Sequence, residues 1–103
     1  MLFQINYKTR TGGSAEQILE SGKRALVLFS KWSLPTGSEV KSFYARADGK
    51  GGSLVVETDD AKAILDGAAK FFAFNDFEVV PMLEVLEAIP ISNEAHAWVE
   101  SMS

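Results

Sequence analysis

Few residues in this chain have side chains that could do chemistry. Asn6 and Tyr7 lie near the start, Tyr44 and Arg46 lie near the middle, and His96 is the only histidine. An arginine could hold a carboxylate or an enolate, and a tyrosine or histidine could move a proton. By spacing these residues form no recognisable catalytic set, and a lone histidine is usually solvated or structurally bonded. No catalytic residue is assigned from the sequence.

The chain offers little for metal or cofactor chemistry. It has no cysteine, which excludes disulfides, thiol catalysis and thiolate metal sites. With one histidine, metal catalysis would rest on carboxylates alone, so we expect neither a metal nor a cofactor. The adjacent Asp59 and Asp60 fit a helix start, with Thr58 or Asp59 as the cap. The GKGG run after Asp48 precedes a strand, which favours a hairpin turn over a phosphate loop.

The composition is typical of a soluble globular protein. The 103 residues are 47% hydrophobic and 23% charged, with a formal net charge of −4, and they predict one domain over residues 1–103. Lysines and arginines are scattered, so we expect no nucleic-acid partner. No apolar run approaches the roughly 20 residues of a membrane span, and the N-terminus has no signal-peptide pattern. We expect a cytoplasmic protein with no membrane contact.

Hydrophobic periodicity predicts four strands and two main helices. Alternation indicates strands over residues 2–8, 40–47, 53–58 and 77–83. Ser14 and Gln17 form a capping box that opens the first helix, and the second helix covers about 61–74. A last short helix is predicted at about 92–102, with Ser92 as its cap. The order β-α-β-β-α-β predicts a ferredoxin-like α+β fold, an antiparallel sheet with helices on one face and strands one and three in the centre.

Candidate ligand contacts follow from the faces of these elements. Gln4 and Asn6 share one face of the first strand, where they either line a cavity or face solvent, and the pattern leaves both open. Trp32 extends the apolar stripe of the first helix, as a ligand platform or, more commonly, as part of the core. The full set of candidates is Gln4, Asn6, Tyr7, Trp32, Tyr44 and Arg46.

The strand over 77–83 has apolar side chains on both faces. Val79 shares one face with Phe77 and Leu83, and Val80 shares the other with Met82. The proline at position 81 cannot donate a ladder hydrogen bond, which predicts an edge strand. An edge strand with two apolar faces needs cover on both sides, and a second subunit is its simplest source. We therefore expect a homodimer.

Four segments of the chain resemble the DUF3303 family of small bacterial proteins. They are MLFQINYKT, LPTG, ADGKGGSLVVETDD and DFEVVPMLE, and together they span about the first 85 residues. The resemblance implies a dimeric α+β barrel, in which two such sheets pack face to face. The family's usual Trp-His pair is absent, because the matching region here is Tyr44–Ala47, and a family tryptophan in the second helix looks replaced near Phe72. The family name brings no catalytic residues.

Three hypotheses for the function follow. The preferred one is a homodimeric α+β barrel that binds a small apolar molecule between its sheet and helices. The alternative is a cofactor-independent monooxygenase or isomerase-like enzyme, as in several proteins of the barrel superfamily. A third is an interaction module that pairs with another protein through an edge strand.

Overall fold

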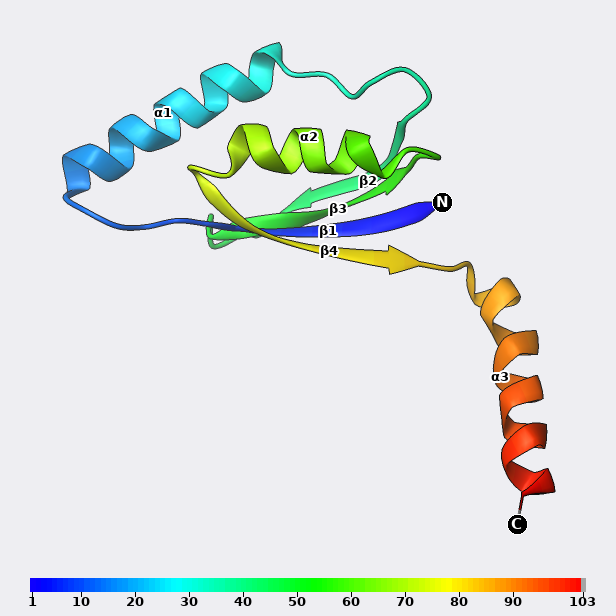
Figure 1. Ribbon diagram of the computed structural model, residues 1–103. Helices are drawn as coiled ribbons and strands as arrows, with labels where there is room; N and C mark the ends of the chain where they lie inside the picture. The colour runs from blue at the N-terminus through cyan, green and yellow to red at the C-terminus, as the bar shows by residue number, and fades with distance from the viewer. Residues whose placement is uncertain (103) are drawn as a thin grey trace.

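A computed structural model describes residues 1–102 and shows a four-stranded sheet with three helices (Figure 1). The elements in chain order are β1 (Leu2–Thr9), α1 (Ala15–Lys31), β2 (Glu39–Ala45), β3 (Gly51–Glu57), α2 (Ala61–Phe71), β4 (Asn75–Met82) and α3 (Val85–Ser101). The strand order is β2-β3-β1-β4, and every neighbouring pair is antiparallel. This confirms the ferredoxin-like fold, with β1 and β3 in the centre and β4 at an edge.

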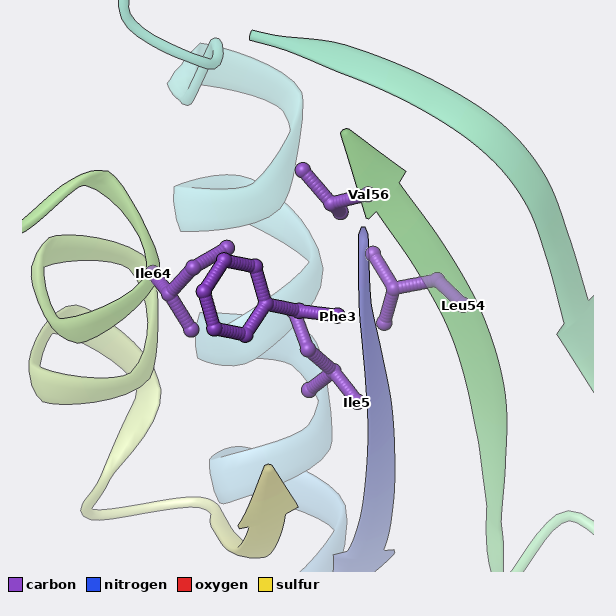
Figure 2. Packing of buried hydrophobic residues seen from close by; sticks show 5 residues of the cluster. All are labelled: Phe3, Ile5, Leu54, Val56 and Ile64. Atoms are coloured by element: carbon purple, nitrogen blue, oxygen red, sulfur yellow. The ribbon is translucent and has the colours of Figure 1, made fainter. Parts of the chain in front are cut away.

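The buried core lies between the sheet and α2 (Figure 2). Residues that alternate along the two central strands point to the same side, because β1 and β3 pair Phe3 with Val56 and Ile5 with Leu54. Ile64 of α2 packs against these four side chains. The alternation of Leu54 and Val56 against their neighbours therefore predicted the buried face correctly.

The turn between β2 and β3 lies two residues earlier than predicted, because β2 ends at Ala45 and β3 begins at Gly51. Gly49 has φ 73°, and the Asp48 carboxylate accepts hydrogen bonds from the Lys50 backbone N–H and from Arg46. The Lys50 hydrogen bond, together with the Arg46 guanidinium, lowers the pKa of the Asp48 carboxyl. Gly51 belongs to β3 rather than to the turn, because it pairs with Lys8 of β1.

The first helix begins as predicted, and the second has a different cap from the one predicted. Ser14 and Gln17 form the capping box of α1. Asp60, rather than Thr58 or Asp59, caps α2 and accepts a hydrogen bond from the Lys62 backbone N–H. The Thr58 hydroxyl is buried, where it accepts from the Asp60 backbone N–H and from the Ser38 hydroxyl, so it ties the loop before β2 to the start of α2.

The second helix was predicted to end at about residue 74, which is too late. The helix ends at Phe71, and Asn75 and Asp76 open β4 rather than marking the end of the helix. Asn75 pairs with Thr9 and Asp76 with Lys8. Asparagine and aspartate are typical of helix ends and turns. Here, pairing with the central strand β1 gives Asn75 and Asp76 a strand conformation instead.

The last helix is longer than the predicted segment 92–102. α3 begins at Val85 and contains Pro90 in its interior. A proline there removes one backbone hydrogen bond, which would have joined position 90 to the Leu86 carbonyl. Leu86 is 83% exposed, so water can reach that carbonyl and the helix continues through the proline. No helix in residues 1–102 is long and apolar enough to cross a membrane.

α1 and α2 lie on one side of the sheet, and α3 projects away from it beyond the end of β4 (Figure 1). None of the side chains in Val85–Ser101 is buried. The opposite face of the sheet carries no helix. Strand register places Gln4 there between Val55 and Val80, with Leu2 beside Met82.

Candidate functional site

An apolar cavity of about 760 Å³ lies between α1, α2 and the helix-bearing face of the sheet. Its floor includes Ile5 and Leu54 from the central strands, and its walls include Leu26 and Phe29 from α1 and Phe71 from α2. Cavities that hold small molecules are usually of about 300–1,000 Å³ and mostly apolar. The size and the lining both suit a small apolar ligand.

The cavity exists because α1 does not close down on the sheet. None of the side chains in Ala15–Lys31 is buried, and the cavity-lining Leu26 and Phe29 are 71% and 46% exposed. Gly22 contributes no side chain at the middle of the helix, and no atom of the described chain lies within 4 Å of where its Cβ would be. The apolar stripe of α1, predicted to pack on the sheet, lines a hollow instead.

Aromatic side chains from four elements and the end of α1 meet in this cavity. The ring of Phe29 lies 5.8 Å from that of Phe43 and 6.2 Å from that of Phe71, and both contacts are edge-to-face. Trp32 lies 5.9 Å from Phe71, and Tyr7 lies 6.2 Å from Phe43, again edge-to-face. Each such contact is worth about 0.5–1.5 kcal/mol beyond the area that it buries. Two of the six predicted ligand contacts, Tyr7 and Trp32, therefore line the cavity.

The polar groups of the cavity are sparse. The Trp32 Nε1 atom is buried and has no hydrogen-bond partner within residues 1–102. Arg10 lies at one side, where its guanidinium is 2.9 Å from the Asp76 carboxylate and 4.5 Å from the centre of the Phe72 ring. The ion pair with Asp76 balances the charge of Arg10. The cavity thus has an apolar body with two cations in its lining, Arg10, which is paired with Asp76, and Lys23, which has no ion-pair partner within residues 1–102.

A second hollow, of about 510 Å³, lies at the end of the sheet near the β2–β3 turn. It brings together four predicted candidates, Asn6, Tyr7, Tyr44 and Arg46. Asn6 donates a hydrogen bond of 3.0 Å to Glu78, and Arg46 forms an ion pair with Asp48. Burial raises the pKa of the Tyr7 phenol. Within the hollow Asn6 is therefore bonded to Glu78, whereas Arg46 is paired with Asp48, which lies outside the lining.

The remaining candidates lie elsewhere. Gln4 lines neither hollow and sits in the middle of the helix-free face of the sheet. His96 belongs to α3, which projects away from both hollows (Figure 1). Among residues 1–102 no group of three or more potential metal ligands gathers. Phe29, Phe43 and Phe71 also line the cavity, but the sequence did not predict them as ligand contacts. The pattern that could have identified them is that each lies on the apolar face of its own helix or strand.

One protein family matches nearly the whole length of the chain. A family model described as a domain of unknown function (DUF3303) matches residues 1–96. The chain belongs to the DUF3303 family. This confirms the resemblance seen in its sequence motifs and extends it beyond residue 85, into α3. No curated protein matches this DUF3303 chain.

The fold is also similar to that of a solved structure outside the family comparison. The crystal structure of muconolactone isomerase superposes on this DUF3303 chain with a TM-score of 0.56 at 15% sequence identity. The match covers 82% of this chain and 90% of that one. At this identity the likeness establishes a shared ferredoxin-like α+β fold, and the activity of a fold is decided by its site.

Proposed function

We propose that this DUF3303 protein is a homodimer that holds a small apolar molecule in the cavity between its sheet and its helices. The cavity is the observation that carries the proposal. Its apolar walls remain exposed to water in the chain, although burial of each large apolar side chain would contribute about 1.5–3 kcal/mol. A ligand that fills the cavity would cover Leu26 and Phe29 and recover part of that free energy.

The residues that line the cavity indicate which kind of ligand would fit it. Its faces are those of phenylalanine and tryptophan rings, which suit a flat or ring-containing apolar molecule. Few polar groups reach the cavity, so the ligand would need few hydrogen-bonding groups of its own. The cysteine-free composition supports a cytoplasmic location for such a complex.

Gly22→Phe is expected to block the cavity. The added ring would enter open space rather than displace protein atoms, because no atom of residues 1–102 lies within 4 Å of the position that a Cβ would take at Gly22. We expect the apolar naphthalene dye ANS, followed by its fluorescence, to bind the Gly22→Phe chain at least tenfold more weakly than the natural chain.

Two variants control this experiment. Gly22→Ala strengthens the helix without filling the cavity, and it should bind ANS as the natural chain does. Gly12→Phe adds the same ring at another glycine with open space around it, outside the cavity lining. Equal ANS affinity for Gly22→Phe and Gly12→Phe would show that ANS does not bind in the cavity.

The homodimer is proposed to form through the helix-free face of the sheet. Val80 lies on this face beside Gln4, and its neighbour Val79 lies on the opposite face beside Ile5. The two valines are similarly exposed, Val80 at 36% and Val79 at 40%. Val79 is therefore a suitable control position for a substitution at Val80. A charge placed in a packed sheet interface would lose its hydration without a partner.

Val80→Asp is therefore expected to yield monomers, whereas Val79→Asp keeps the dimer. Light scattering over a range of concentrations measures both variants beside the natural chain. A monomeric natural chain at every concentration, or equal masses for the two variants, would contradict a dimer built on this face.

A further inference from the structure

Within residues 1–102, α3 buries none of its side chains. Its side chains are all at least partly exposed across Val85–Ser101, with Leu86 at 83% and Trp98 at 65%. Isolated helices of this length are marginal in water, because most helix stability comes from packing. An interior proline costs about 3 kcal/mol more. Glu84 makes no side-chain hydrogen bond to cap the helix start, so α3 needs a surface to pack against.

The side chains of α3 indicate which kind of surface would pack against it. Apolar residues recur at alternating spacings of three and four, which places them in one stripe along the helix. The stripe consists of Ala88, Ile91, Ala95, Trp98 and Met102. The charged residues of α3 are all acidic, namely Glu87, Glu94 and Glu100. Around the helix Glu87 and Glu94 flank the stripe on one side, whereas Glu100 lies on the opposite face. The matching surface should therefore combine apolar and basic side chains.

The second half of α1 has this character. Val27 and Leu28 are exposed there. Around the helix Arg24 and Lys31 lie between these two residues, and Lys23 lies next to Val27. None of these three cations has an ion-pair partner within residues 1–102. Opposite charges of this kind select partners and fix their register. The acidic α3 and the basic half of α1 are complementary.

Within one chain the two helices lie far apart. α3 leaves the end of β4 and runs on the side of the sheet opposite α1 and α2 (Figure 1). In a face-to-face dimer, a second copy lies on that same side. Packed sheets are about 10 Å apart, and a helix of 17 residues is about 25 Å long. The C-terminal half of α3 can therefore pass the edge of the second sheet and reach the helices beyond it.

We propose that the C-terminal half of α3 of each chain docks on α1 of a second copy, with Ala95 and Trp98 against Val27 and Leu28 and with Glu94 beside Arg24 and Lys31. The inference rests on the homodimer of the proposed function. Two-fold symmetry makes the contact reciprocal, so each dimer contains it twice. The helix layer of each subunit would then be held from outside by the other chain.

Substitutions in the full-length chain test the contact. Trp98→Asp, within the stripe, is expected to weaken dimerisation at least tenfold by light scattering. Ala97→Asp places the same charge on the neighbouring residue, off the stripe, and should leave the dimer unchanged. Both variants should keep the fold of the sheet, as followed by circular dichroism, because α3 buries nothing against it.

Cross-linking locates the contact. The chain has no cysteine, so two single-cysteine chains, Glu94→Cys and Arg24→Cys, can be mixed after reversible unfolding and treated with a short bismaleimide. We expect a two-chain product from this mixture. The control replaces Arg24→Cys with Lys50→Cys on the β2–β3 turn and should give little product.

The outcomes separate the two proposals. A dimer that Val80→Asp breaks, but that Trp98→Asp leaves unchanged and that gives no α3–α1 cross-link, overturns the docking of α3 and keeps the sheet-face homodimer. A natural chain that is monomeric overturns both, while ANS binding still reports on the cavity by itself. Equal cross-linking to Arg24→Cys and to Lys50→Cys also overturns the docking.

Discussion

Gly51→Ala is expected to lower the free energy of unfolding by about 3 kcal/mol or more. Gly51 has φ 152°, and a Cβ there would lie 2.0 Å from the backbone oxygen of Tyr7. That oxygen belongs to the central strand β1 and cannot move without disturbing the pairing of the sheet. Urea unfolding followed by circular dichroism measures the loss.

Gly49→Ala is the matched control. Gly49 also has a positive φ, of 73°, but no atom of residues 1–102 lies within 4 Å of its Cβ position. Only the left-handed backbone then opposes alanine, which costs about 1–2 kcal/mol. Similar losses in both variants would show that the close approach of β1 to Gly51 contributes little.

Leu54→Ala is expected to cost about 2–5 kcal/mol, whereas Leu26→Ala should change stability by no more than about 0.5 kcal/mol. The side chain removed is the same in both variants. Leu54 is 7% exposed within the core cluster, and Leu26 is 71% exposed along the cavity wall. Because few side chains make up the core, Leu54→Ala removes a large share of it.

Urea unfolding of the two leucine variants in the absence of ligand makes this comparison. Leu26→Ala should instead weaken ANS binding, since it removes a wall of the cavity. A loss of stability for Leu26→Ala as large as for Leu54→Ala would mean that α1 packs on the sheet and that the cavity is closed.

The sequence predicted the sheet better than the helix ends. Alternation grouped Phe3 with Ile5 on one face of β1 and Leu54 with Val56 on one face of β3, because side chains on a strand point to opposite faces with a period of two. Strand pairing with β1 overrode the local preferences of Gly51 and Asn75. No single-residue pattern reports such long-range pairing, which is why these boundaries were wrong.

The site was predicted only in part, for a related reason. Periodicity shows which side of α1 is apolar, but the distance between that side and the sheet depends on the connecting loops and on small residues such as Gly22. Tyr7 and Trp32 were predicted as contacts from their residue types. Phe29, Phe43 and Phe71 come from three separate elements, and only the folded topology brings their rings together.

The place of β1 between β3 and β4 governs the order of folding. β1 comes first among the strands, yet both of its neighbours lie far along the chain, and Leu2 pairs with Met82. Only the β2–β3 hairpin pairs strands that are close in sequence. Long-range strand pairing is slow, since the intervening chain must be ordered first. During synthesis β1 therefore has both edges open until β3 has been made, and one edge open to pairing with other chains until β4 has been made.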